Sequence, residues 1–154
     1  MNFKKQFSEG LLTKNPVTVQ LLGMCSVLAG GGDEVAAPAV DLVSKMYKGA
    51  GGYAVEVTPS GFDNTITMMV GVDNAGAVTG ISIIDHSETA GLGAVAAATT
   101  AAGEAFRAQF QGLTGSVSVS KDGGQVDAIT SATITSRAVC AGVNAALTVV
   151  ANMG

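Results

Sequence analysis

The stretch Asp127-Ala128-Ile129-Thr130-Ser131-Ala132-Thr133-Ile134-Thr135-Ser136 is the one around which this chain is organised. It follows a glycine turn and leads into a helical pattern, so it marks the start of a helix. Small and hydroxyl-bearing side chains there leave backbone N–H groups open to a ligand, and a helix N-terminus favours an anion such as phosphate. The simpler alternative is a capped helix start, in which Thr130 or Ser131 caps and no ligand binds.

Resemblance to a known family sharpens this interpretation. The run from Asp127 to Thr133 resembles the flavinylation motif of FMN-binding domains: Asp, two small or apolar residues, Ser or Thr, Gly, Ala, and a final Thr or Ser. Such domains occur in the G subunit of Rnf complexes and in the C subunit of the sodium-pumping NADH:quinone reductase. The resemblance implies that FMN is attached through its phosphate to the hydroxyl of Thr133. Ser131 stands where the family usually has Gly, and we expect this small residue to be tolerated.

Four hydroxyls compete for the attachment. Thr130 takes the family's Ser/Thr position and is expected to cap or to hydrogen-bond, while Ser131 takes the Gly position, so its hydroxyl cannot be required. Thr135 lies two residues beyond Thr133, where the first helical turn restricts its χ1, and it is the second choice. The resemblance also implies a separate flavin transferase that uses FAD and Mg²⁺ and recognises Asp127. The cofactor-binding residues expected from this motif are Asp127, Thr130, Ser131, Ala132, Thr133, Ile134 and Thr135.

A second motif precedes the first by about forty residues. The run Asp85-His86-Ser87-Glu88-Thr89-Ala90-Gly91-Leu92-Gly93 resembles the family signature His-x-Glu-Thr-Pro-Gly-Leu-Gly, with Ala90 in place of Pro. In those domains the loop lies against the flavin, and glycines permit such close backbone approach. His86 is the chain's one histidine, so no multi-histidine metal site is expected. The resemblance implies flavin contacts from Glu88, Thr89, Gly91, Leu92 and Gly93.

Length, composition and charge bound the class of protein. At 154 residues a single folded domain is expected, and 47% hydrophobic against 13% charged residues allow a core with a sparsely charged surface. The net charge of −4 argues against nucleic acid as a partner. The charge is uneven, because residues 33–154 hold five of the 8 basic and eleven of the 12 acidic residues. A basic N-terminal segment and an acidic remainder suggest that these two parts of the chain lie in different environments.

Residues 1–32 have the layout of a signal peptide or short membrane anchor. Three lysines precede an uncharged run from Pro16 to Gly32, and two acidic residues follow it. This pattern predicts a domain outside the cytoplasmic membrane with the N-terminus inside. The run is short for a spanning helix, which needs about 20 apolar residues, so a soluble helix or loose segment stays open as the alternative.

Residues 1–29 also resemble the start of the Rnf E subunit and its Nqr relative, multi-helix membrane proteins in which a Cys at this place helps to hold an iron–sulfur cluster. Cys25 alone cannot supply the usual four thiolates, so we expect no cluster and interpret residues 1–32 as a fused or truncated leader. Cys140 lies far away in the sequence, and no disulfide between the two is expected.

The remaining pattern predicts an α+β domain over residues 40–154, after a linker at 33–39. A short helix is expected from Val40 to Met46, three antiparallel strands across 52–85 with a hairpin at Asp73–Gly76, and a strand at 115–120 before a turn at 122–124. Two main helices are expected to pack on the sheet. Their apolar stripes are Val95, Ala98, Ala102, Phe106 and Phe110 for 93–110, and Val139, Val143, Leu147 and Val150 for 135–150.

No nucleophile–base–acid set is found, so no catalytic residue is assigned. The resemblance, which covers about residues 40–152, implies an electron-carrier domain with covalent FMN that exchanges electrons with other subunits of a membrane redox complex. Two alternatives stay open: a module that binds flavin or phosphate noncovalently, and a non-redox extracytoplasmic interaction domain. Flavin colour that survives acid precipitation distinguishes the first function from both.

Overall fold

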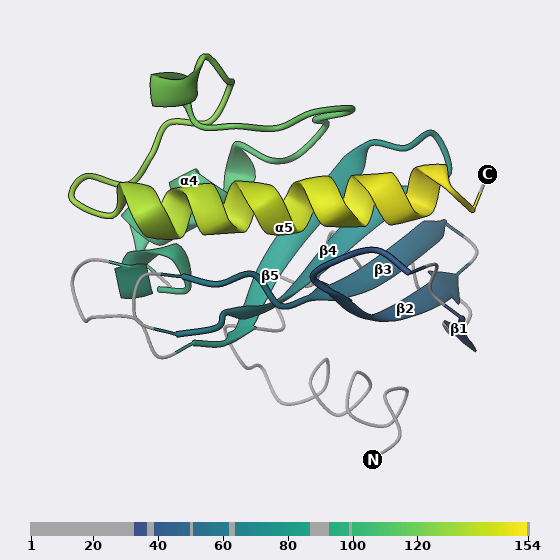
Figure 1. Ribbon diagram of the computed structural model, residues 1–154. Coiled ribbons are helices and arrows are strands. Elements are labelled where there is room, and N and C mark those ends of the chain that lie inside the picture. Colours follow the sequence, from purple (N-terminus) through teal and green to yellow (C-terminus); the bar gives the residue numbers. More distant parts are fainter. Residues whose placement is uncertain are drawn as a thin grey trace.

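The chain folds as an antiparallel sheet with one long helix laid across it (Figure 1). The computed structural model describes residues 33–36, 39–49, 51–61, 64–86, 93–98 and 100–153. The sheet order β1-β2-β3-β4-β5 follows the sequence, so each strand pairs antiparallel with its neighbour along the chain. The predicted α+β class is therefore confirmed. The strands are β1 (Asp33–Val35), β2 (Val43–Gly49), β3 (Gly52–Val57), β4 (Thr67–Asp73) and β5 (Val78–Asp85).

The predicted three-stranded meander and its hairpin are confirmed in β3, β4 and β5. At the β4–β5 turn, the Asp73 carboxylate accepts hydrogen bonds from the backbone N–H groups of Ala75 and Ala77, both at 2.9 Å. Gly76 has a φ of +80°, a conformation that costs little only for glycine. The aspartate and the glycine therefore fix this turn through local chemistry.

The helix predicted from Val40 to Met46 is wrong, because Val43–Gly49 forms strand β2. A short apolar segment does not distinguish a helix from a strand by its pattern alone. Here β3 supplies the deciding partner, with Met46 opposite Val55 and Tyr47 opposite Ala54. Part of the segment expected to be a linker, Asp33–Val35, adds strand β1 to the edge of the same sheet.

The C-terminal helix α5 (Thr133–Ala151) is covered on two sides. Its contact with the sheet is close at Gly142, where an added Cβ would lie 3.1 Å from atoms of Met68, Pro59 and Val57. On the side away from the sheet runs the segment that follows α4, as Figure 1 shows. The side-chain amide of Asn144 pairs there with the backbone N–H and C=O of Val117, both at 2.7 Å.

This double coverage explains the composition of α5. The predicted stripe of Val139, Val143, Leu147 and Val150 is buried, which confirms it, and several residues on the helix's other faces are buried as well. A helix that is apolar on most faces is typical of a core. Among the described residues, α5 is the one helix that is long and apolar enough to cross a membrane. However, 67% of its apolar stretch is buried inside the fold. We therefore interpret it as the core helix of the domain.

The single helix predicted over residues 93–110 is interrupted, and in this respect the prediction is wrong. A 3₁₀ turn, η1 (Gly93–Ala96), comes first, and helix α4 (Ala101–Ala108) follows. The Thr100 hydroxyl accepts a hydrogen bond from the N–H of Gly103 at 3.3 Å and so caps α4.

The guanidinium of Arg107 occupies the break between η1 and α4. This buried group donates to the carbonyl of Ala96 and, at 2.9 Å, to that of Ala98. Burial lowers the pKa of Arg107, and the nearby Glu104 opposes the shift. Of the predicted stripe, Phe106 and Phe110 are buried and meet edge to face at 5.4 Å, whereas Ala102 is exposed.

Candidate functional site

The motif forms a tight turn that ends at the first residue of α5. The N–H of Ala132 bonds to the carbonyl of Ile129 at 3.0 Å, and Ser131 between them has a φ of +64°. This left-handed conformation is the physical reason for a glycine at the corresponding family position, and Ser adopts it at some cost.

The alternative in which Thr130 or Ser131 caps the helix is contradicted, because the N-cap residue of α5 is Ala132, whose methyl group cannot cap. Ser136 supports the turn from inside the helix. Its buried hydroxyl donates to the carbonyl of Ala132 at 2.9 Å and accepts from the N–H of Ile129 at 3.0 Å. Thr133 is therefore the first residue of α5, and its side chain is half-buried.

A second turn, η2 (Ser120–Asp122), lies beside the start of α5 (Figure 1). It belongs to a loop closed by a parallel bridge between Val119 and Val126, where a full strand was wrongly predicted. Gly123 reverses the chain with a φ of +84°. Gly124 passes so close to the carbonyl oxygen of Ser118 that an added Cβ would lie 2.0 Å from it. These glycines fold η2 back toward the helix.

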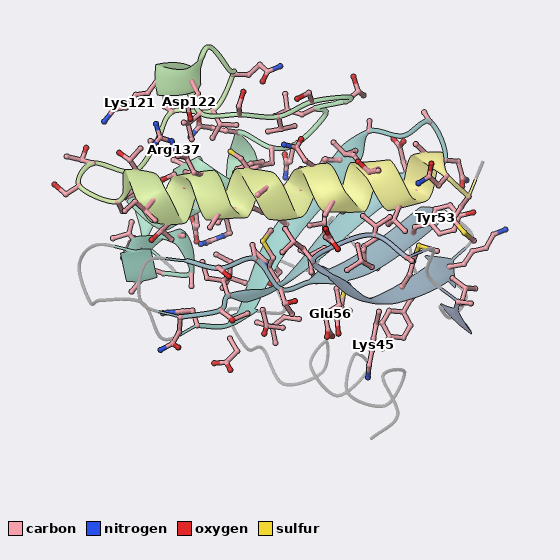
Figure 2. All side chains as sticks on the ribbon, viewed as in Figure 1. Lys45, Tyr53, Glu56, Lys121, Asp122 and Arg137 are labelled. Carbon is pink, nitrogen blue, oxygen red and sulfur yellow. The ribbon has the colours of Figure 1, made fainter. Side chains whose placement is uncertain are left out.

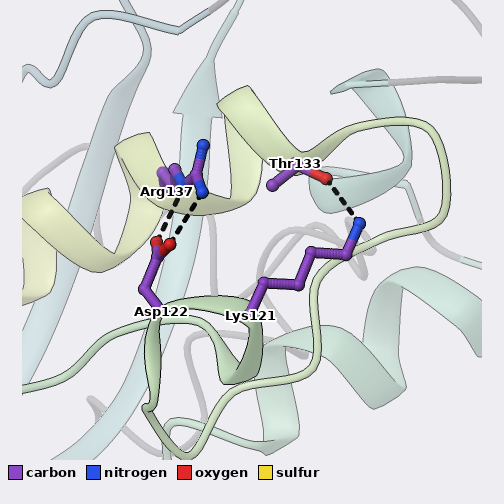
Figure 3. Close-up of polar contacts among 4 residues, drawn as sticks. All are labelled: Lys121, Asp122, Thr133 and Arg137. Atoms are coloured by element: carbon purple, nitrogen blue, oxygen red, sulfur yellow. Dashed lines mark hydrogen bonds and ion pairs between the residues drawn. The ribbon is translucent and has the colours of Figure 1, made fainter.

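Two side chains of η2 contact the first turns of α5 (Figure 3). The ammonium of Lys121 donates a hydrogen bond to the hydroxyl of Thr133, with an Nζ–Oγ1 distance of 3.2 Å. The next residue, Asp122, accepts two hydrogen bonds from Arg137, from Nε and from Nη2, each at 2.7 Å. The Arg137 hydrogen bonds lower the pKa of the Asp122 carboxyl, and Asp122 in turn raises the pKa of Arg137.

These groups fit a phosphate ester at Thr133. The hydroxyl is at a helix N-terminus, where backbone N–H groups and the dipole favour an anion. An ammonium is already within hydrogen-bonding distance of that hydroxyl. In Figure 2 the labelled Lys121, Asp122 and Arg137 gather at this end of α5, whereas Lys45, Tyr53 and Glu56 lie toward the other end of the molecule. Among the residues described, no group of three or more His, Cys, Asp or Glu side chains could hold a metal ion.

Comparison with known sequences supplies the family. The sequence profile of the FMN-binding domain matches residues 61–148, which is more than half of the chain. The chain belongs to the FMN-binding domain family. The match contains strands β4 and β5 and most of α5, so the Thr133 site lies within the matched region, whereas β1, β2 and β3 precede it.

Curated relatives of this FMN-binding domain protein belong to ion-translocating complexes. The G subunit of the ion-translocating oxidoreductase complex of Methanosarcina acetivorans is 40% identical over 90 residues, which are 57% of this chain and 45% of that protein. The G subunit of the Na(+)-translocating ferredoxin:NAD(+) oxidoreductase complex of Acetobacterium woodii is 36% identical over 110 residues, covering 66% of this chain and 50% of the relative. The chain spans about half the length of the curated relatives it matches.

Within this FMN-binding domain, the competing hydroxyls differ in access. Thr130 and Ser131 are exposed, Thr133 is half-buried, and Thr135 is 1% exposed. The side chain of Ile134 is 50% exposed beside Thr133. Glu88, Thr89, Gly91 and Leu92 of the second motif lie outside the described residues, as does the segment 1–32, while Gly93 begins η1.

Sequence reasoning missed Lys121, Arg137 and Gln109. The Gln109 amide donates to the carbonyl of Asp127 at 3.2 Å and accepts from the N–H of Asp127 at 2.7 Å. Lys121 and Asp122 are polar residues of a turn, and no local pattern separates them from ordinary surface charges. Their contacts arise only when the glycine turn brings η2 against α5.

Proposed function

We propose that this chain is an electron carrier whose FMN is joined through its phosphate to the hydroxyl of Thr133. The observation that carries the proposal is the contact between that hydroxyl and the Lys121 ammonium at the first residue of α5. Thr135, the second choice, is 1% exposed, so it cannot meet a large donor molecule without opening the helix. Exposed Thr130 and Ser131 lie in the turn before the helix.

The chain's own residues hold the phosphate end of the cofactor. When bound, FMN supplies the redox chemistry through its isoalloxazine ring. The start of α5 offers the N-terminal end of a helix dipole, Lys121 offers a cation, and the buried Ser136 hydroxyl keeps the preceding turn closed. A covalent link retains the cofactor even where the site at the helix start is open to solvent.

The relatives support the proposed partners. These are named as G subunits of ion-translocating oxidoreductase complexes, so the proposed carrier exchanges electrons with other subunits of such a complex. Attachment of FMN requires a flavin transferase during maturation, for which Asp127 is part of the recognition motif. The Asp127 side chain is exposed, while its backbone is held by Gln109, an arrangement suited to recognition from outside.

The proposed location is the outer side of the cytoplasmic membrane, with residues 1–32 as the attachment to it. The support is the charge pattern, in which three lysines are followed by an uncharged run and then by the acidic segment of residues 33–154. Protease added to intact spheroplasts should then digest residues 40–154. Complete protection of that region would exclude this topology.

The covalent link is tested by coexpressing the chain with a flavin transferase and weighing the intact protein. The unmodified sequence should gain the mass of FMN, Thr133→Ala should not, and Thr135→Ala should remain flavinylated. Thr133→Ser should retain part of the attachment, because a hydroxyl is still present at that position. Flavin that binds but is released on acid precipitation would support a noncovalent module instead. Full attachment to Thr133→Ala would show that another hydroxyl is used.

A further inference from the structure

The charge next to the acceptor hydroxyl is the feature of this site that the family motif does not specify. Lys121 is exposed on η2, outside the run from Asp127 to Thr133, yet its Nζ lies 3.2 Å from Thr133 Oγ1. An ammonium has three donors and no acceptor, so it can only donate to a lone pair of that oxygen. The hydroxyl proton of Thr133 therefore points away from Lys121 and stays available for transfer.

Building on the proposed attachment at Thr133, we infer that Lys121 is a positioning residue for flavinylation and afterwards the cation that holds the phosphodiester. It orients Oγ1 before the reaction. It then faces the negative charge that appears at the same place when the ester forms. The contact is weak with the neutral hydroxyl and strengthens as the phosphoryl group reaches Oγ1, so it is stronger in the transition state than in the ground state, which is the condition for accelerating the step.

The neighbouring ion pair explains how a flexible lysine is held there. Asp122 and Arg137 are joined by two hydrogen bonds of 2.7 Å, a paired geometry that fixes direction as well as distance. Asp122 follows Lys121 directly, and Arg137 lies one helical turn after Thr133. The pair therefore fastens η2 to α5 beside the acceptor hydroxyl, as Figure 3 shows.

The same pair separates the roles of the two cations. The charge of Arg137 is matched by Asp122, whereas Lys121 donates to a neutral hydroxyl. A phosphate at Thr133 would have to compete with Asp122 for Arg137, but it meets no such competitor at the contact between Lys121 and Thr133. Lys121 is therefore the cation that gains a counter-ion when the ester is made.

The step balances without a redox change. Oγ1 of Thr133 attacks the FAD phosphorus that bears the riboflavin part, and an Oγ1–P bond forms as the bond from that phosphorus to the bridging oxygen breaks. AMP leaves with the bridging oxygen, and the hydroxyl proton passes to a base of the transferase. Negative charge stays on the non-bridging oxygens of the new diester, next to Oγ1 and within reach of the Lys121 ammonium.

The test compares Lys121→Gln and Lys121→Arg with a matched control, Lys45→Gln. The control makes the same charge change at the exposed Lys45 of β2, away from the start of α5 (Figure 2). Purified chains are incubated with flavin transferase, FAD and Mg²⁺, and intact mass follows the attached FMN at several concentrations of acceptor chain. Lys121→Gln should lower kcat about tenfold. This effect is smaller than the loss of about 100-fold or more that follows removal of a hydrogen-bond donor from a closed active site, because Lys121 is exposed to solvent. Lys121→Arg should recover part of the rate, and Lys45→Gln should match the unmodified chain.

The KM of the acceptor chain distinguishes positioning from docking. An effect of Lys121→Gln confined to KM, with kcat unchanged, would make Lys121 a contact for the transferase and overturn the inference. Equal kinetics for Lys121→Gln and the unmodified chain would overturn it as well, while leaving Thr133 as the attachment residue. Failure of the unmodified chain itself to gain FMN would instead remove the proposed function.

A second measurement does not depend on the rate. With excess transferase and long incubation, Lys121→Gln is carried to full attachment, and the ³¹P resonance of the diester is compared with that of the unmodified chain. If Lys121 contacts the diester, its removal should change the ³¹P chemical shift in Lys121→Gln relative to the unmodified chain. Lys45→Gln should have the same chemical shift as the unmodified chain. Identical resonances in the unmodified chain and in Lys121→Gln would show that Lys121 does not hold the phosphate.

Discussion

The side-chain amide of Gln109 forms a two-way hydrogen-bonded pair with the backbone of Asp127. Its Nε2 donates to the Asp127 carbonyl at 3.2 Å, and its Oε1 accepts from the Asp127 N–H at 2.7 Å. Gln109 is the C-cap residue of α4, so this pair joins the end of one helix to the start of the motif that leads into the other. The first residue of the motif is thereby held by a residue 18 positions earlier.

Loss of this pair should loosen the motif. We expect Gln109→Ala to lower the free energy of unfolding by about 1–2 kcal/mol, since two hydrogen bonds to a partly exposed backbone are removed. Flavin attachment should also slow, because the backbone of Asp127 is then no longer held in one conformation for the transferase. Gln111→Ala is the matched control, because Gln111 is exposed two residues further on. Thermal unfolding and intact mass after incubation with transferase check the two effects, and equal behaviour of both variants would contradict the prediction.

The left-handed Ser131 predicts opposite effects of two substitutions. Ser131→Gly should keep the site and raise the stability by up to about 1 kcal/mol, because glycine adopts a φ of +64° without the steric cost of a Cβ. Ser131→Val should lower the stability by more than about 1 kcal/mol, because a β-branched residue fits this region poorly. Urea unfolding measures both. Loss of flavinylation in folded Ser131→Gly would show that the Ser131 hydroxyl is required after all.

The elements that could be predicted from sequence are those with local causes. The hairpin at Asp73–Gly76 needs only an aspartate and a glycine at fixed spacing, and α5 has a long apolar stripe. The break before α4 depends on Arg107 reaching back to the carbonyls of Ala96 and Ala98, which no local pattern reveals. Strand β2 likewise exists because β3 pairs with it.

The candidate site divides in the same way. Thr133 could be proposed as the attachment residue because the motif resembles a family motif, and the structure adds its half-buried position at the first residue of α5. Lys121 could not be assigned, since the sequence places it in an ordinary polar turn. Its contact with Thr133 spans 12 residues and depends on the chain reversal at Gly123 and on the close passage of Gly124 by Ser118.

The close contact at Gly142 predicts that a single methyl group is harmful. A Cβ there would lie 3.1 Å from Met68 Sδ, Pro59 Cγ and Val57 Cγ2 at once. Ala gains about 1 kcal/mol of helix propensity over Gly, but overpacking typically costs about 1–3 kcal/mol. We therefore expect Gly142→Ala to lower the melting temperature. Ala141→Gly at the adjacent exposed position measures the propensity term alone, and a higher melting temperature for Gly142→Ala would refute the overpacking argument.

The thiol of Cys140 predicts a loss of stability at alkaline pH. Burial, with a smaller contribution from Asp122, raises its pKa from 9.0 to about 11. The thiol therefore contributes fully to the free energy of unfolding below pH 9. This contribution falls as the pH rises toward 11, because the thiol ionises at a lower pH in the unfolded chain than in the folded one. The loss of stability is at most about 2–3 kcal/mol. In a Cys25→Ser background, Cys140→Ala should flatten the stability profile between pH 9 and 11. Alkylation of Cys140 in the folded chain at pH 8 should be slow, and rapid labelling would contradict its burial.

Under the proposed location, helix α5 also bears on how the domain would cross the membrane. It follows the five strands in the sequence, and its 19 residues are apolar enough to insert into a bilayer if they enter the translocon before the domain has folded. Arg137 and Asn144, which bind Asp122 and Val117 in the folded domain, oppose this outcome. An arginine costs about 2.5–3.5 kcal/mol at the centre of an inserting helix and less toward its ends. Under the proposed location, replacing both residues by Leu should convert α5 into a stop-transfer segment. Protease protection of the C-terminus in spheroplasts would then reveal a chain that remains threaded through the membrane.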